Sequence, residues 1–99
     1  MNKENSKTLF YRVEGQSMSP TIEDGDIVEV YPYFPYCTGD VIAFKQGQKC
    51  YIKRLKRVDN NRLWVESDNK NIATFDSNAF GYIDREQVIG VVRNYERNV

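Results

Sequence analysis

The sequence predicts a mostly β domain, a compact barrel or sandwich in which helix is limited to short turns. Short runs of β-branched and aromatic residues recur along the chain, Gly, Pro, Asn or Asp bounds each run, and no segment keeps a helical period. Ninety-nine residues are enough for one continuous hydrophobic core. We therefore expect a single domain at residues 9–95, with a flexible tail at residues 1–8 and another at residues 96–99.

The expected strands follow one another at short intervals. They are residues 9–13, 27–31, 40–44, 49–58, 62–66 and 88–92. The segment Asp59-Asn60-Asn61 suits a hairpin loop, and Pro20 suits a single helical turn at residues 19–23 that Asp24-Gly25-Asp26 ends. The last strand is a continuous apolar run, which is typical of a strand buried on both faces.

Composition excludes several kinds of function. Fourteen basic residues balance fourteen acidic ones, so the chain lacks the positive field that non-specific nucleic-acid binding needs. No apolar run is long enough to span a bilayer and no secretory signal is recognisable, which predicts a cytoplasmic protein without membrane contact. The absence of histidine excludes histidine-based triads and the usual zinc sites, and we expect no metal and no cofactor. Cys37 and Cys50 are expected to be reduced and partly buried, with a disulfide or a reactive thiol as the alternative.

A hydrolase without histidine needs a carboxylate pair, a bound metal, or a nucleophile activated by lysine. Most carboxylates here fall beside turns, where Asp serves the backbone. Lysine activation fits better, because strand alternation places Lys53 on one face with Tyr51 and Leu55. Apolar neighbours can desolvate the amine and lower its pKa, so that neutral Lys53 acts as a base. The alternative is that Lys53 belongs to a solvated run of charges at residues 53–57.

Ser17 lies in a segment that can expose a nucleophile. Gly15 precedes it, and Pro20 and the Asp24-Gly25-Asp26 turn follow it. Such bends can present a hydroxyl together with free backbone amides, which hold the oxyanion that forms in acyl transfer. Taken alone, a Gly-x-Ser before a turn is a weak indication of a catalytic site.

Three segments in order carry a more specific signal. They are Gly15-Gln16-Ser17-Met18-Ser19-Pro20-Thr21-Ile22, then Gly39 to Phe44 with Tyr51 to Leu55, and finally Glu66 to Asn69 with Val88 to Asn94. Together they resemble the LexA-type Ser/Lys peptidases, a family that shares its clan with the type I signal peptidases. The resemblance covers about residues 10–94 and implies the fold of the LexA C-terminal domain.

The resemblance also implies site residues. Ser17 is the expected nucleophile and Lys53 the expected general base, so their side chains should lie within hydrogen-bond reach. The backbone amides of Gln16 and Ser17 are the expected oxyanion hole. Ser67 is expected to orient the lysine amine, by analogy with signal peptidases, although a hydroxyl at the end of a strand often serves the turn instead.

The implied function is a serine endopeptidase that acts on a polypeptide, as the catalytic and dimerisation domain of a phage-repressor or SOS-response-like regulator. A homodimer is therefore expected. The residues ahead of Ser17 cannot hold a helix-turn-helix domain, so we expect no direct nucleic-acid binding by this chain. They also contain no Ala-Gly or Cys-Gly bond, which argues against self-cleavage.

Two alternatives remain open. One is a non-catalytic dimerisation or partner-binding module, which the aromatic and proline-rich residues 31–36 favour. The other is a soluble relative of the signal peptidases.

Overall fold

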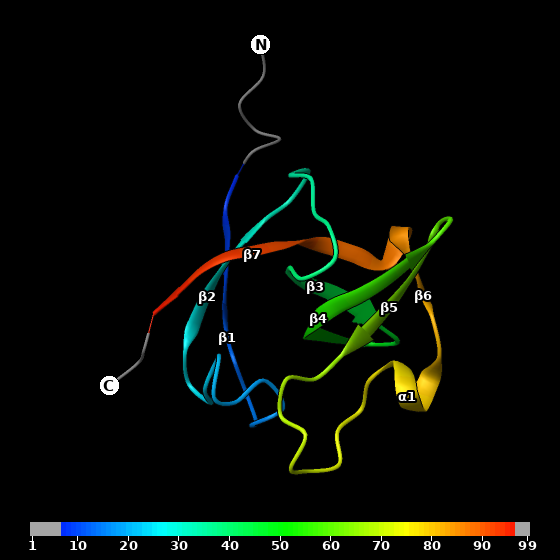
Figure 1. Ribbon diagram of the computed structural model, residues 1–99. Coiled ribbons are helices and arrows are strands. Elements are labelled where there is room, and N and C mark those ends of the chain that lie inside the picture. Colours follow the sequence, from blue (N-terminus) through cyan, green and yellow to red (C-terminus); the bar gives the residue numbers. More distant parts are fainter. Residues whose placement is uncertain (1–6, 97–99) are drawn as a thin grey trace.

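A computed structural model describes residues 7–96, in which a curled antiparallel sheet has the strand order β1-β2-β7-β3-β4-β5-β6 (Figure 1). The strands are β1 (Leu9–Arg12), β2 (Ile27–Tyr31), β3 (Val41–Gln46), β4 (Lys49–Asp59), β5 (Arg62–Glu66), β6 (Ile83–Asp84) and β7 (Val88–Glu96). Helix within the described residues is limited to α1 (Ser77–Phe80) and the 3-10 helix η2 (Arg85–Gln87). The predicted fold class, mostly β with short helical turns, is confirmed.

Each strand expected from the sequence is present. β2 and β5 have the expected bounds, and the other strands have an end shifted by a few residues. β4 and β5 form the expected hairpin, where Asn60 has a positive φ of 58° that asparagine tolerates well. The turn expected at residues 19–23 is not a helix, but an isolated turn in which the Ile22 N–H donates to the Met18 carbonyl. The elements that the sequence did not indicate, α1, β6 and η2, are too short to produce a recognisable period.

The expected tails fall largely outside the described residues. Residues 1–6 and 97–99 are not described, while Glu96 is the last residue of β7 and not the first of a tail. Within residues 7–96, no helix is long and apolar enough to cross a membrane.

The core consists of two apolar clusters that meet at β3. Val41 and Ala43 belong to the first cluster, whereas Ile42 and Phe44 belong to the second. Since alternate residues of a strand point to opposite faces, β3 is buried on both faces. Burial on both faces was expected for residues 88–92 instead. In that segment only Gly90 and Val91 are buried and the flanking residues are half-buried, so this expectation is wrong.

The curl of the sheet is set around β7. β7 has an extra residue at two places, Arg93 opposite the Glu29–Val30 step of β2 and Ile89 opposite the Ala43–Phe44 step of β3. Such bulges bend a strand and increase its twist. Gly90 permits the close approach of β2, because a Cβ added there would lie 2.7 Å from the Tyr31 carbonyl oxygen.

Candidate active site

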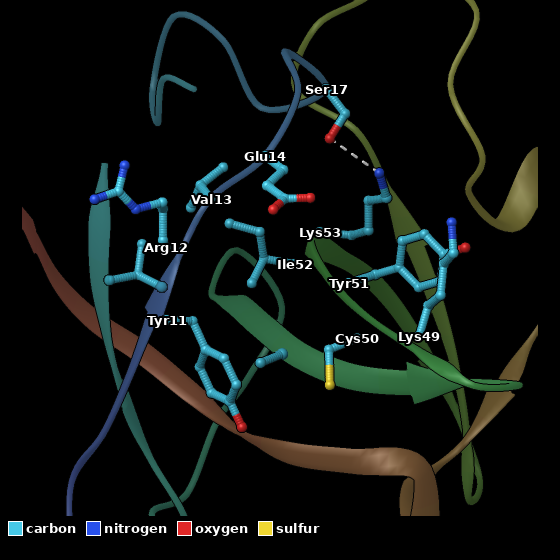
Figure 2. Close-up of a pocket in the computed structure, with 12 residues that line it drawn as sticks. Tyr11, Arg12, Val13, Glu14, Ser17, Lys49, Cys50, Tyr51, Ile52 and Lys53 are labelled. Carbon is cyan, nitrogen blue, oxygen red and sulfur yellow. Dashed lines mark hydrogen bonds between the residues drawn. The ribbon is translucent and has the colours of Figure 1, made fainter. Parts of the chain in front are cut away.

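Ser17 and Lys53 meet in the folded chain. The Lys53 Nζ donates a hydrogen bond of 3.1 Å to the Ser17 Oγ (Figure 2). Ser17 comes from the loop between β1 and β2, and Lys53 from the middle of β4. Lys53 is only 3% exposed and shares its buried face with Leu55, as strand alternation predicts. The expected approach of the two side chains is confirmed, and Lys53 is not one of the solvated charges in its run.

The surroundings of Lys53 favour its neutral form. Burial lowers the pKa of Lys53 because the ammonium loses its hydration, while the negative charge of Asp76 raises this pKa by a smaller amount. The ring of Tyr51 lies beside the amine, with its centroid 5.7 Å from the Nζ, a contact that favours the ammonium and so also opposes burial. A lysine with a lowered pKa can accept the proton of a serine hydroxyl closer to neutral pH than an ordinary lysine can.

Asp76 is a site residue that sequence reasoning missed. It is 5% exposed and caps the N-terminus of α1. Its Oδ1 accepts from the Asn78 backbone N–H at 3.0 Å and the Asn78 side-chain amide at 3.3 Å, and its Oδ2 accepts from the Ser67 N–H at 2.9 Å. Burial raises the pKa of Asp76, but these hydrogen bonds and the attraction of Lys53 outweigh burial and leave the pKa below its ordinary value. The pattern Asp76-Ser77-Asn78 is recognisable as a helix cap, but nothing in the sequence indicates that it lies near Lys53.

Ser67 does not orient the lysine amine as expected. Arg54 pairs with Glu66 between β4 and β5, so continuing this register puts Lys53 and Ser67 opposite each other on one face. The Ser67 Oγ is nevertheless buried without a hydrogen-bond partner among residues 7–96. The contribution of Ser67 is through its backbone N–H, which holds Asp76.

The backbone around Ser17 leaves amide donors free. The Gly15 N–H donates to Asp24 Oδ1, and the Ser19 N–H donates to the Gln16 carbonyl. The N–H groups of Gln16, Ser17 and Met18 have no acceptor within the described part of the chain. The two amides expected to form an oxyanion hole are therefore available for a ligand.

An ion pair anchors the strand that carries the lysine. Arg54, the neighbour of Lys53, donates from its Nε to Asp68 Oδ1 at 3.1 Å and from its Nη2 to Asp68 Oδ2 at 2.5 Å. Burial raises the pKa of Asp68, but its hydrogen bonds and the charge of Arg54 outweigh burial and lower it overall. The sequence did not predict this pair, because Asp68 lies beyond the end of β5 and its partner lies on β4.

A groove of about 270 Å³ opens beside the two side chains (Figure 2). Residues 11–14 line one side of it, residues 49–53 line the other, and the buried side chains of Val28 and Ala43 contribute an apolar floor. Among the described residues, β1 pairs with β2 alone, and residues 49–53 pair with β3 alone. Both sides of the groove therefore have a backbone edge without a neighbouring strand.

Cys37 and Cys50 are free and exposed, so the expectation of partial burial is wrong. Cys50 lines the groove. Among residues 7–96, no group of three or more His, Cys, Asp or Glu side chains is arranged to hold a metal ion.

Comparison with known proteins agrees with the resemblance found in the sequence. The family model described as peptidase S24-like matches residues 1–93. Signal peptidase I of Streptococcus pneumoniae serotype 4 (strain TIGR4) is 31% identical over 85 residues, covering 71% of this chain and 42% of the relative. Signal peptidase I of Streptococcus pneumoniae strain R6 gives the same values. This chain thus spans less than half the length of the curated relatives that it matches. The family match extends over nearly the whole chain, and we conclude that this serine peptidase-like domain belongs to the peptidase S24-like family.

Proposed function

We propose that this chain hydrolyses a polypeptide, with Ser17 as the nucleophile and Lys53 as the general base. The observation that carries the proposal is the 3.1 Å hydrogen bond between the Ser17 hydroxyl and a buried lysine amine. Burial lowers the pKa of Lys53, which favours the proton-accepting form that a base requires.

The reaction proceeds in two stages. In the first, neutral Lys53 takes the hydroxyl proton as the Ser17 Oγ attacks the carbonyl carbon of the scissile peptide. The amides of Gln16 and Ser17 stabilise the negative charge on the carbonyl oxygen. The C–N bond then breaks, and the Lys53 ammonium gives its proton to the leaving nitrogen. In the second stage, water attacks the acyl-enzyme, Lys53 accepts a proton from that water, and Ser17 Oγ regains a proton as the carboxylic acid product leaves.

The substrate is an extended polypeptide segment. An extended strand in the groove has an unpaired backbone edge on either side, at residues 11–14 and at residues 49–53. Backbone hydrogen bonds to such edges supply affinity, and alternate side chains of the substrate point toward the floor. Because Val28 and Ala43 contribute that floor, small apolar side chains suit it best.

Labelling with a serine-directed fluorophosphonate tests the proposal. Ser17 is expected to become the modified residue by mass spectrometry, at a rate that rises with pH as Lys53 loses its proton. Ser17→Ala should remove the label, and Ser19→Ala, which removes a neighbouring hydroxyl from the same loop, should keep it. A wild-type protein that stays unlabelled, or a label that persists in Ser17→Ala, contradicts the proposal.

Two lysine variants test the base. Lys53→Arg should lose the reactivity of Ser17, because a guanidinium does not give up its proton in this pH range. Lys56→Arg changes an exposed lysine of the same strand that does not line the groove and should react as the wild type does. Equal losses in the two variants would show that Lys53 has no special role.

We also propose the finer biological setting that the resemblance implies, a cytoplasmic homodimer acting as the peptidase part of a repressor or SOS-type regulator. Sedimentation at high concentration should show a dimer, and a clean monomer would contradict this. One observation supports the alternative of a partner-binding module, since Tyr33 is 82% exposed and Phe34 is also exposed. A chain that binds a partner but never labels at Ser17 would favour that alternative.

A further inference from the structure

We infer that Asn69 is a positioning residue that fixes the peptide plane from which the Ser17 amide points into the site. This inference rests on the proposed function, because the orientation of that amide has a chemical role only if Ser17 carries out acyl transfer. Asn69 lies beyond β5, far from Ser17 in the sequence.

Asn69 contacts two successive carbonyls of the nucleophile loop. Its backbone N–H donates to the Ser17 carbonyl at 2.9 Å, and its side-chain Nδ2 donates to the Gln16 carbonyl at 2.8 Å. The Gln16 carbonyl also accepts from the Ser19 N–H at 3.2 Å. This carbonyl therefore has two donors, one from its own loop and one from Asn69.

The geometry of the peptide bond transmits this contact to the Ser17 amide. The Gln16 carbonyl and the Ser17 N–H belong to the same planar trans peptide, so they point in opposite directions. A donor that holds the carbonyl oxygen on one side thereby limits rotation of the N–H on the other. The Ser17 N–H itself has no acceptor among residues 7–96, so no direct bond within that part of the chain fixes it.

The orientation of the Asn69 side chain is itself determined. Its Oδ1 accepts from the Asn71 N–H at 2.9 Å, and a backbone N–H can only donate. The other terminal atom of Asn69 must therefore be the NH₂ group that faces the Gln16 carbonyl. Asn69 thus donates to the loop in a way that an aspartate at this position could not.

The segment that carries Asn69 is anchored near both proposed catalytic residues. Its neighbour Asp68 is paired with Arg54, the residue after Lys53 in β4. The Asp68 N–H also faces the Met18 Sδ at 3.4 Å, and Met18 is buried directly after Ser17. Residues 68–69 therefore connect the strand of the base to the loop of the nucleophile.

The test measures how fast a fluorophosphonate inactivates Ser17 as a function of reagent concentration and pH. Asn69→Ala should lower the limiting rate of inactivation by about 10- to 100-fold, less than the 10²- to 10³-fold typical when an oxyanion donor is removed outright. The reagent concentration that gives half of the limiting rate should stay unchanged, because binding of the reagent is not altered. The pH midpoint of inactivation should also stay unchanged, because Lys53 is not altered. The control is Asn71→Ala, which should react as fast as the wild type. It removes a side-chain amide from the same loop but keeps the Asn71 backbone N–H that donates to Asn69 Oδ1.

Several outcomes overturn the inference. One is a rate of inactivation in Asn69→Ala that equals the wild-type rate. Another is a decrease of that rate in Asn71→Ala as large as in Asn69→Ala. A third is a decrease in Asn69→Ala together with a shifted pH midpoint, which would place the effect on Lys53. If thermal melting shows that Asn69→Ala is unfolded, Asn69→Ser is tested in its place. The serine side chain is polar, but its hydroxyl is too short to reach the Gln16 carbonyl. Failure of the proposed function is distinguishable, since the wild type itself would then remain unlabelled.

Discussion

Replacing Asp76 by asparagine keeps the size of the side chain and removes its charge. The charge of Asp76 opposes the effect of burial on Lys53, so its removal should lower the pKa of Lys53 further. A larger fraction of Lys53 is then neutral at any given pH below its pKa. We expect Asp76→Asn to shift the pH dependence of Ser17 labelling to lower pH and to increase labelling near neutrality.

The same substitution should weaken the fold. The Asp76 carboxylate accepts three hydrogen bonds, from the Ser67 N–H and from two nitrogens of Asn78. An asparagine offers one oxygen, so the Ser67 N–H or the Asn78 N–H must face an NH₂ group. A buried donor left unsatisfied costs about 1–3 kcal/mol. Each kcal/mol lowers the Tm of a domain of this size by roughly 4–8 °C. Because asparagine also caps helices well, the start of α1 should persist.

The measurements are the pH dependence of fluorophosphonate labelling at Ser17 and thermal melting. Glu66→Gln is the matched control, because Glu66 stands opposite Arg54 on the other face of the hairpin from Lys53. The control should leave the midpoint of labelling unchanged. A midpoint in Asp76→Asn that is unchanged or higher than in the wild type would refute the electrostatic reasoning, whatever happens to the Tm.

Three further predictions concern stability and processing. Lys53→Met should stabilise the fold at a pH where Lys53 is charged, because it removes the cost of burying an ammonium. Burial lowers the pKa of Lys53, so the wild type is destabilised most at a pH below the folded-state pKa of Lys53. This destabilisation disappears as the pH rises toward 10.5, the ordinary pKa of lysine. The Tm values of the two proteins should therefore converge at alkaline pH. Gly90→Ala should cost about 1–3 kcal/mol in urea denaturation, because its Cβ would lie 2.7 Å from the Tyr31 carbonyl oxygen, and an unchanged midpoint would show that β2 and β7 can separate easily. Prolonged alkaline incubation should leave the chain intact by mass spectrometry, and fragments that are absent from Ser17→Ala would contradict this.

Strand alternation predicted which face of β4 carries Lys53. The two-residue period of β4 places Lys53 on the same face as Leu55 whatever the rest of the fold does, but it left open whether Lys53 is buried or belongs to a solvated run of charges. The approach of Lys53 to Ser17 was predicted only from the resemblance to a family, because a period says nothing about which distant loop lies above a strand.

The partners of Lys53 show what local rules cannot supply. The hydroxyl of Ser67 lies on the correct face but makes no hydrogen bond within the described residues, while Asp76 supplies the nearby charge. Choosing between them requires the path of the chain from β5 to α1, and that path has no regular pattern to read. The free cysteines illustrate a similar limit, since burial preference is an average over proteins and Cys50 lies at an exposed end of β4.

The double burial of β3 has a consequence for how the molecule opens. Because Val41 and Ala43 face one apolar cluster and Ile42 and Phe44 face the other, neither cluster can come apart without exposing this strand. The two halves of the sheet should therefore unfold as one cooperative unit, and the amide protons of β3 should be among the slowest to exchange with solvent. The loop that carries Ser17 buries Met18 and Ile22 in the first cluster, so this part of the loop should open only together with the core. The amides of Gln16 and Ser17, which have no acceptor among residues 7–96, should exchange sooner.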